Sequence, residues 1–536
     1  MTRKKLERLL FHKFGLFILI LSFVACSPKA ANTPLNNNGA VNNDKVITLL
    51  FTNDVESAYD PIPAFWLDNM ESIGGIAELT TLIINIRQEQ PNVFLFDAGD
   101  IFTGSLAKET HGALAFDLMT LMDYDAMAIG NHEFEYGANV LAWQKDRAPF
   151  PVLAANMYYK DTDHPFAQAY TIVERNGVRI GVVGIMGRDA VSAIIPSYVA
   201  AVDVRDEAVE AQRAIDAIRG DVDIIVLLTH QGKTAPMQTD AESDPRLQRD
   251  IDADIALSGA LRGVDVHFAG HADAGTPKPI VHPTTGTLIM QTYGQATHLG
   301  FLQLTLDGGT GKIKKHDGKL IPVNPKKYQP NKVITARLTQ YRERFPELYG
   351  TVGYTSQYMS RRYIEESDVG NLFADIMREA AGTDIALLHS GSLRKDIPQG
   401  PVNRADLLDV YPFIDTVDTM QITGAQLKEV LEQSLTLERG LLQISGFEIS
   451  YDLSRPKFDR LVTMTRGGDN IRPSDTLTVA APTFLAEGGD LYTTFSDIQI
   501  GPGYGLVSSV IIEYFTKSDP SNAVASPPKG RQKELK

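Results

Sequence analysis

The chain has 536 residues, of which 43% are hydrophobic and 22% are charged, and its formal net charge is −15. This length is sufficient for two or three domains, and the ordinary composition argues against a wholly disordered protein. The negative charge disfavours binding to a nucleic-acid polymer or to an anionic membrane surface, because both need a basic face. The single cysteine, Cys26, excludes disulfides within the chain and a zinc site made of several thiolates. Nothing in the sequence indicates an obligate protein partner.

The first 25 residues have the pattern of a secretory signal peptide. Basic residues within 1–13 precede the apolar run FGLFILILSFVA at 14–25, which ends in a small alanine before Cys26. Phe-Val-Ala-Cys resembles the lipobox of bacterial lipoproteins, which implies cleavage before Cys26 and acylation of its thiol. The alternative is an ordinary N-terminal membrane helix, although this run is short for a bilayer. We expect an exported protein whose lipid anchor at Cys26 contacts the membrane of the cell envelope, on the outer-membrane or periplasmic side or at the cell surface.

Composition divides the rest of the chain into two blocks with flexible flanks. Residues 26–44, rich in Asn, Ala and Pro, are predicted to be a tether. The blocks span 45–321 and 351–516. The join at 322–350 contains Pro322, Pro325 and Pro330 and the helical pattern NKVITARLTQYRERF, which predicts a linker helix that serves as a hinge. Residues 517–536 are polar with three prolines and are predicted to be a disordered tail.

The first block alternates short β-branched runs with amphipathic stretches. Five runs have the pattern of buried strands: ITLLFTND, VFLFDAGD, AMAIGNH, DIIVLLTH and VDVHFAGH. Helical patterns lie between them, one beginning near Gly75 and another in DEAVEAQRAIDAIRG, closed by Gly220. This alternation predicts an α/β domain, in which ligands bind at the carboxyl ends of the strands.

Each of these five predicted strands ends in a side chain that can bind a metal ion. A single such residue is more often a helix cap or a turn residue, but five consecutive strand ends of this kind are hard to obtain by chance. Oxygen and nitrogen donors without thiolate suit Mn, Mg, Ca, Fe or Zn. The strand-end residues are Asp54 with Glu56, Asp100, Asn131 with His132, His230, and His271 with Asp273.

The motifs TND, DAGD, GNHEFEYG, LLTHQG and AGHAD together resemble the metallophosphatase domain of the 5′-nucleotidases, and GNHEFEYG is the most specific of them. Those enzymes are periplasmic or surface-bound, and they hydrolyse nucleoside monophosphates and, in some members, UDP-sugars. The resemblance covers nearly all of the chain after the tether. It implies an α/β protein with a four-layer αββα metallophosphatase domain, followed by a smaller α+β C-terminal domain.

The resemblance also implies a site for two divalent metal ions. A hydroxide bridging the two ions would attack the phosphoryl group in line with the leaving oxygen. Asp100 would bridge both ions. The other ligands would be Asn131, His230 and His271 at one ion, and Asp54, Glu56 and Asp273 at the other.

The same resemblance gives roles to His132 and Glu135. His132 would stabilise the transition-state charge or protonate the leaving alkoxide, and Glu135 would orient its ring. The family usually has Asp at position 135, His at position 56 and His or Gln at position 273, where this chain has Glu135, Glu56 and Asp273. Two added carboxylates beside Asp54 predict that this ion is a harder one, such as Mn, Mg or Ca, rather than Zn.

Residues 351–516 resemble the C-terminal domain of the same family. The matching pieces are RRYIEESDVGNLFADIMREAAGTDIALLHSGSLR, PFIDT, TGAQLKEVL, LLQISGFEISYD and TFLAEGGDLYTTF. In the family this domain binds the nucleotide through a phosphate-binding arginine, two aromatic rings that stack on the base and an aspartate that binds ribose. These roles carry over to Arg394, Phe413, Phe484 and Asp490, while His389 replaces an asparagine that contacts the base.

We therefore expect a metal-dependent phosphoesterase that hydrolyses extracellular or periplasmic nucleotides, with AMP-like, UDP-sugar or cyclic compounds as candidate substrates. One alternative is a thiosulfate-ester hydrolase of the same fold. Another is a nucleotide-binding surface lipoprotein with weak catalysis, which Glu56, Glu135 and Asp273 keep open.

Overall fold

The computed structural model describes residues 44–535 with the exception of residue 65 and residues 235–249. All of these residues belong to one compact unit, Asn43–Lys536. The predicted signal peptide, Cys26 and all but the last residue of the predicted tether lie outside the described residues. Along the described chain, no helix is both long enough and apolar enough to span a membrane.

The first block contains two six-stranded sheets, and the first sheet has a parallel centre. Its strand order is β16 (Ile313–Pro322), β15 (His298–Leu306), β1 (Lys45–Thr52), β4 (Val93–Asp97), β5 (Ala126–Ala128) and β6 (Val152–Leu153). Strands β1, β4, β5 and β6 run parallel, whereas β15 is antiparallel to both β1 and β16. The residues that follow β1, β4 and β5 therefore lie along one edge of this sheet.

The second sheet packs face to face on the first. Its order is β13 (Ile280–Val281), β14 (Leu288–Met290), β12 (Val266–His271), β11 (Ile224–Gln231), β9 (Val178–Met186) and β8 (Tyr170–Arg175). Strands β9, β11, β12 and β14 run parallel. A buried apolar cluster joins the two sheets, and within it the rings of Phe51 and Phe268 stack with centroids 4.0 Å apart. Burial on both faces explains the near-continuous apolar runs of β1, β4, β11 and β12.

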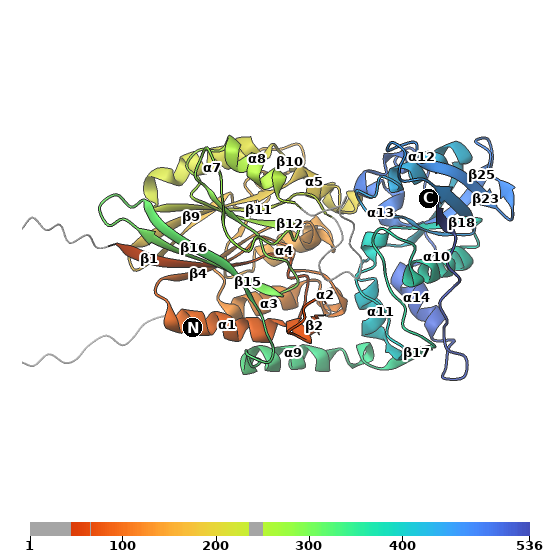
Figure 1. Ribbon diagram of the computed structural model, residues 1–536, viewed down its shortest axis with the longest axis horizontal. Coiled ribbons are helices and arrows are strands. Elements are labelled where there is room, and N and C mark those ends of the chain that lie inside the picture. The colour runs from red at the N-terminus through yellow and green to blue at the C-terminus, as the bar shows by residue number, and fades with distance from the viewer. Residues whose placement is uncertain (1–43, 65, 235–249, 536) are drawn as a thin grey trace, which may run out of the picture. The chain divides into compact units, whose positions relative to one another are not determined.

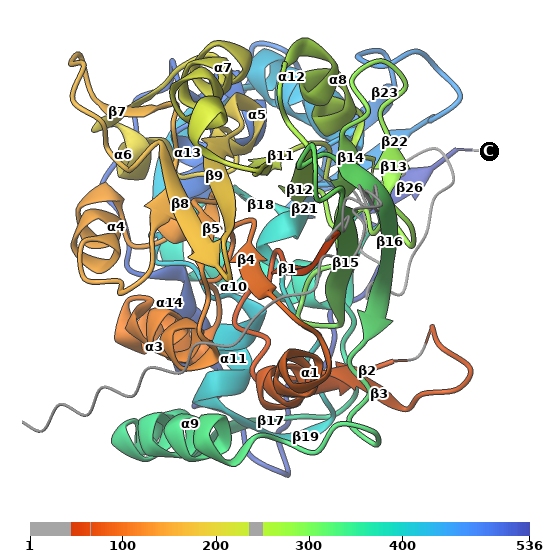
Figure 2. The ribbon, with the colours of Figure 1, turned by 90° about the vertical axis from the view of Figure 1, so that its left-hand side faces the viewer.

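Helices cover the outer faces of both sheets (Figures 1 and 2). Helices α1 (Ile76–Glu89) and α3 (Ala113–Met122) lie on the first sheet, and α7 (Glu207–Ile218) and α8 (Asp252–Ala260) lie on the second. The resulting order of helix, sheet, sheet and helix confirms the predicted αββα architecture. The shorter elements are β2 (Pro61–Pro63), β3 (Ser72–Gly74), α2 (Ser105–Thr110), η1 (His132–Phe134), α4 (Ala138–Lys145), β7 (Met157–Tyr159), α5 (Arg188–Val191), α6 (Pro196–Val199), β10 (Val202–Val204) and η2 (Arg219–Asp221).

The helix predicted in the join is α9 (Lys332–Arg344), followed by η3 (Pro346–Leu348). The side chain of Asn331 caps its N-terminus by accepting hydrogen bonds from the backbone N–H groups of Val333 and Ile334 at 2.9 and 3.2 Å. Ile334 and Leu338 are buried where α9 packs against α1 and α3. The helix is thus part of the first block's outer layer.

The second block is a smaller α+β arrangement. Its main sheet has the order β20 (Val417–Thr423), β25 (Thr476–Pro482), β18 (Ile385–Leu388) and β21 (Gln443–Ser445). Besides a further sheet, this block contains β17 (Thr351–Thr355), α10 (Asp368–Ala381), η4 (Ser390–Ser392), β19 (Gly400–Asn403), α11 (Arg404–Val410), α12 (Gly424–Ser434), α13 (Thr483–Ala486), η5 (Gly489–Leu491), η6 (Thr493–Phe495) and α14 (Val507–Phe515).

The segment after residue 516 is ordered through residue 535, so the prediction of a disordered tail is wrong. Strand β26 (Gln532–Glu534) pairs in parallel with β22 (Glu448–Tyr451), in a sheet that continues through β23 (Leu461–Arg466) and β24 (Asp469–Asn470). The guanidinium of Arg531 donates to both carboxylate oxygens of Asp375 at 2.8 and 2.6 Å. A polar, proline-rich composition does not reveal that the backbone can join an existing sheet edge.

Candidate active site

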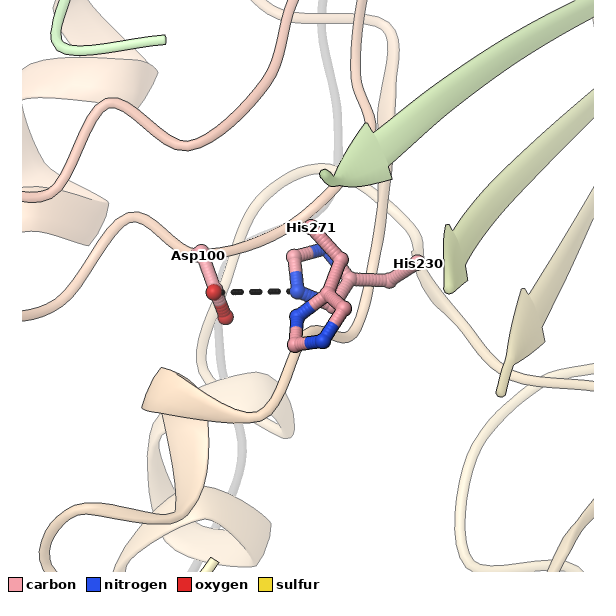
Figure 3. A group of neighbouring side chains, drawn as sticks. All are labelled: Asp100, His230 and His271. Atoms are coloured by element: carbon pink, nitrogen blue, oxygen red, sulfur yellow. Dashed lines mark ion pairs between the residues drawn. The ribbon is translucent and has the colours of Figure 1, made fainter. Parts of the chain in front are cut away.

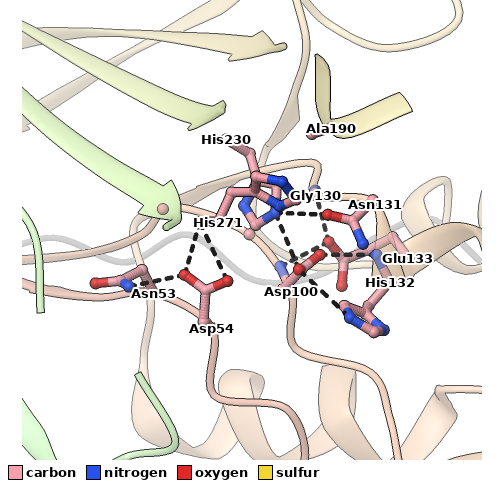
Figure 4. Close-up of polar contacts among 12 residues, drawn as sticks. Asn53, Asp54, Asp100, Gly130, Asn131, His132, Glu133, Ala190, His230 and His271 are labelled. Carbon is pink, nitrogen blue, oxygen red and sulfur yellow. Dashed lines mark hydrogen bonds and ion pairs between the residues drawn. The ribbon is translucent and has the colours of Figure 1, made fainter. Parts of the chain in front are cut away.

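The residues that follow the five predicted strands meet at one place (Figure 4). Strands β1, β4 and β5 bring their ends from the first sheet, and β11 and β12 bring theirs from the second. His230 is completely buried behind the other members of the group. The others line one cavity: Asp54, Glu56, Asp100, Asn131, His132, Glu135, His271 and Asp273.

Backbone geometry at the site is unusual. A positive φ is costly for a residue with a side chain, because Cβ crowds the neighbouring carbonyl oxygen. Five of the seven predicted ligands have a positive φ: Asp54 (50°), Glu56 (45°), Asp100 (62°), His271 (72°) and Asp273 (49°). Such strain concentrates at functional sites, where the surrounding structure holds it in place.

Glycines in the same loops allow the strand ends to approach closely. A Cβ atom on Gly130 would lie 2.2 Å from Oδ1 of Asp100 and 2.6 Å from its backbone nitrogen. A Cβ atom on Gly270 would lie 2.6 Å from the carbonyl oxygen of Ala98 and 2.9 Å from Nδ1 of His230. In the motifs DAGD, GNH and AGH, the glycine thus leaves room for the side chains that can bind a metal ion.

Asp100, His230 and His271 form a compact group of donors (Figure 3). Nε2 of His230 lies 2.9 Å from Oδ2 of Asp100 and 3.0 Å from Oδ1 of Asn131, while its Nδ1 lies 2.9 Å from the carbonyl oxygen of Ala98. Burial would raise the pKa of Asp100, but the charges of His230 and His132 outweigh it and lower that pKa. His271 has its pKa lowered by burial and by the neighbouring His230.

The donor set fits a pair of divalent cations. Nε2 of His271 is buried and has no hydrogen-bond partner among the described residues, as expected for an atom that ligates a metal. The backbone N–H of His271 donates to both oxygens of Asp54, at 3.1 and 2.9 Å, which ties the first sheet to the second. Glu56, Asp100 and His132 form a second group whose ligand atoms lie within 4.8 Å of one another.

His132 is held on three sides. Its Nδ1 lies 2.6 Å from Oε1 of Glu135 and 3.0 Å from the hydroxyl of Thr103, and its backbone N–H donates to Oδ1 of Asp100 at 2.7 Å. Its ring stacks on Phe413 with centroids 6.1 Å apart. Burial would lower the pKa of His132, but the carboxylates of Asp100 and Glu135 outweigh it and raise that pKa to about 9. The longer side chain of Glu135 therefore does reach the ring.

The residues predicted in the second block line the same cavity: His389, Arg394, Phe413, Phe484 and Asp490. Nε2 of His389 lies 2.8 Å from Oδ2 of Asp490, and the ring of His389 meets Phe484 edge-on at 5.6 Å. Oδ1 of Asp490 is buried without a hydrogen-bond partner in the described part of the chain. The guanidinium of Arg394 contacts Oε1 of Glu56. One cavity thus joins the donor cluster to the aromatic and charged side chains of the second block.

Two residues of the site were not foreseen from the sequence. Glu133 is fully buried, and its carboxylate accepts hydrogen bonds from the backbone N–H groups of Asp100, Ile101 and Gly130 at 2.9, 2.8 and 2.6 Å. Burial raises its pKa to about 7. The acidic residue directly after His132 in the motif GNHEFE is the sequence signal that could have indicated this role.

Arg439 is the second unforeseen residue, and no sequence motif marks it. Its side chain lines the cavity, with Nε 3.8 Å from Oδ1 of Asp490. Its Nη2 donates to the hydroxyl of Ser192 at 3.1 Å. Because Ser192 follows α5 in the first block, the contact could not be inferred from local sequence.

Comparison with known proteins agrees with this arrangement. Residues 47–272 match the calcineurin-like phosphoesterase family, and residues 350–497 match the 5′-nucleotidase C-terminal domain. A 5′-nucleotidase of Vibrio vulnificus is 28% identical over 530 residues, which covers 90% of this chain and 92% of that protein.

Solved structures show the same two-domain fold. The structure of a 5′-nucleotidase precursor from Thermus thermophilus has 25% sequence identity and a TM-score of 0.79, and the match covers 92% of this chain and 99% of that one. The sulfate thiohydrolase SoxB of Thermus thermophilus shares the fold at 18% identity and a TM-score of 0.73, over 91% of this chain and 96% of that one.

Proposed function

The chain belongs to the 5′-nucleotidase family of calcineurin-like phosphoesterases, and we propose that it is a phosphoric ester hydrolase that acts on nucleotides with the help of two divalent metal ions. The observation that carries this proposal is the convergence of oxygen and nitrogen donors from five strand ends on a cavity that the second block also lines. Residues 45–321 would hold the metal ions, and residues 351–516 would bind the nucleoside.

Two groups of side chains would hold the metal ions. Asp100 lies between them, next to His230 and near His271. Bound divalent ions would polarise the phosphoryl group and activate the attacking water. We assign Asn131, His230 and His271 to one ion and Asp54 and Asp273 to the other, where the carboxylates favour a harder ion such as Mn, Mg or Ca. Glu56, predicted as a further ligand of this second ion, also contacts Arg394.

His132 would handle the proton of the leaving group. Its Nδ1 is occupied by Glu135 and Thr103, so Nε2 is the atom that remains for the substrate. The carboxylates of Asp100 and Glu135 raise the pKa of the ring, which suits a group that stabilises developing negative charge or protonates an alkoxide. Glu135 positions the ring rather than touching the substrate.

The second block would bind the rest of the nucleotide. Arg394 offers a planar pair of donors for phosphate oxygens. Phe413 and Phe484 present aromatic surface to the base from the cavity wall. Oδ1 of Asp490 faces Arg439 but accepts no hydrogen bond from the described residues, so it is available for a ribose hydroxyl, and Nε2 of His389 lies 2.8 Å from the other oxygen of that carboxylate.

Activity of metal-reconstituted protein tests the proposal. Residues 27–536 would be stripped of metal and assayed with Mn, Mg, Ca, Co or Zn against AMP, UDP-glucose, a cyclic nucleotide and a thiosulfate conjugate. We expect metal-dependent hydrolysis, seen as phosphate release from AMP or as formation of the monophosphate products of UDP-glucose or the cyclic nucleotide, and we expect it to be lost in Asp100→Asn and His132→Ala. Tight nucleotide binding without turnover under any metal would instead support a binding protein, and turnover of the thiosulfate conjugate alone would support a thiosulfate-ester hydrolase.

We also propose that the protein is exported and held at the cell envelope by a lipid on Cys26. Support comes from the basic start, the apolar run and the Phe-Val-Ala-Cys motif of the sequence. Cys26→Ser should abolish fatty-acid labelling and move the protein out of the membrane fraction. Unchanged fractionation and labelling of this variant would refute the anchor.

A further inference from the structure

A segment of the first block, residues 188–199, lies against the second block (Figure 1). It comprises α5, α6 and the loop between them. The carbonyl oxygen of Ser192 accepts a hydrogen bond from the backbone N–H of Asp490 at 2.7 Å, and the backbone N–H of Ser197 donates to the carboxylate of Glu487 at 2.8 Å. These two bonds hold the segment to the turn that follows α13.

The same segment is also bound to the loop that precedes β20. The hydroxyl of Tyr198 donates to the carbonyl oxygen of Ile414 at 2.5 Å, and Ile414 directly follows Phe413 in the chain. Phe484, the other ring proposed to stack on the base, lies in α13, directly before the turn held by the first two bonds. The segment is therefore fastened to both loops that carry these rings.

Apolar side chains of the segment line the same cavity as the two rings, namely those of Ala193, Ile194 and Ile195, next to Tyr198. Ile194 belongs to the buried apolar cluster against which Tyr198 and Phe413 pack, so part of this surface serves the core. Ala193, in contrast, is only partly buried although it lines the cavity. These three aliphatic side chains offer contact area but no hydrogen bond, which suits an apolar face of a ligand.

We propose that Ala193, Ile194 and Ile195 are specificity-determining residues that contact the base of a bound nucleotide. The first block would then supply an apolar wall of the base site, beside the two rings of the second block. This wall favours phosphoesters that carry a planar base over sugar phosphates that have none. Because its side chains make no hydrogen bonds, the wall responds to the presence of a base and not to its identity. This inference rests on the proposed function of the same site.

The test compares metal-loaded wild-type protein with Ala193→Phe, which adds a ring to the wall in space that the base would occupy. The substrates are AMP and ribose 5-phosphate, which has the same phosphate and sugar but no base. We expect the variant to lower the ratio of kcat/KM for AMP over ribose 5-phosphate by about tenfold or more. Ala200→Phe is the matched control, because it makes the same change at an exposed position after α6, outside the cavity, and should leave the ratio unchanged.

Binding of a nucleoside provides a readout that does not depend on turnover or on the metal ions, because adenosine has no phosphate. Calorimetry should show that wild-type protein binds adenosine and that Ala193→Phe binds it about tenfold more weakly. Ala200→Phe should bind it as the wild type does. Urea denaturation of both variants shows whether the fold is kept, and a change in the substrate ratio with unchanged stability would separate base contact from a structural role.

Three outcomes would overturn the inference. The first is an unchanged substrate ratio together with unchanged adenosine affinity in Ala193→Phe. The second is an equal loss for AMP and ribose 5-phosphate, which would mean that the segment acts on the phosphoryl end of the site. The third is a wild-type protein that neither binds adenosine nor prefers AMP. If wild-type protein hydrolyses neither ester but adenosine binding still weakens in the variant, the apolar wall stands and the proposed hydrolysis fails.

Discussion

At the scale of single residues, the space beside Asp100 decides whether the donors can assemble. Gly130→Ala would place a methyl group within 2.2 Å of Oδ1 of Asp100, so either the carboxylate or the loop must move. We expect hydrolysis to fall by at least about 100-fold and bound metal to decrease. Phosphate release and elemental analysis measure these effects. Gly220→Ala, where a Cβ atom meets nothing within 4 Å, is the control and should keep both.

Glu133 supports the same turn through the backbone. Glu133→Ala would leave the buried N–H groups of Asp100, Ile101 and Gly130 without their acceptor. We expect the free energy of unfolding to fall by about 3 kcal/mol, as measured by urea denaturation. Glu174→Ala changes an exposed glutamate and should shift it by no more than about 0.5 kcal/mol. An equally small shift for Glu133→Ala would mean that water or the backbone replaces the carboxylate.

At the scale of elements, the tail strand β26 is expected to contribute to stability. Arg531→Ala removes both bonds to Asp375 and the bond to the carbonyl oxygen of Ile444 at 3.0 Å. Because this pair is largely shielded from solvent, we expect a loss of about 2 kcal/mol in the free energy of unfolding. Lys533→Ala, at an exposed position of β26, should change it little. Equal effects of the two substitutions would argue that the tail is dispensable.

Strand ends could be predicted because their signal is local. A run such as VFLFDAGD contains both the buried strand β4 and the donor Asp100 that follows it. Its membership in a sheet is not local: β1 and β12 have similar apolar patterns but belong to different sheets, since strand pairing depends on segments far away in the sequence. For the same reason the role of Arg439 could not be predicted, because its hydrogen-bond partner Ser192 lies in the other block.

At the scale of the whole molecule, the two blocks are joined by polar contacts around the cavity. Nζ of Lys108 donates to the carbonyl oxygen of Phe413 at 3.1 Å and to the hydroxyl of Ser508 at 2.8 Å. Asp415 lies nearby, and the hydroxyl of Tyr411 donates to its carboxylate at 2.9 Å. Burial raises the pKa of Asp415 to about 7, although Tyr411 and Lys108 partly offset it.

This raised pKa predicts how stability depends on pH. The folded state binds the proton of Asp415 more tightly than the unfolded state does, so its contribution is present below about pH 4 and is lost as pH rises to about 7. The asparagine side chain of Asp415→Asn cannot ionise, so the variant does not lose this stability as pH rises. We expect the stability of the variant relative to wild type to increase by roughly 2–4 kcal/mol over this range in urea denaturation. If the difference in unfolding free energy between the variant and the wild type stays constant with pH, the pKa of Asp415 is not raised in the folded state.

The left-handed backbone at Glu56 and His271 has an evolutionary consequence. Each such residue costs the fold of the order of 1–3 kcal/mol, and glycine would relieve that cost. Selection for heat resistance alone would therefore favour mutations that erase the chemistry of these loops. Adaptation of this enzyme to a hotter habitat therefore requires stabilising mutations outside the ligand loops, because within these loops a more stable residue is a less active one.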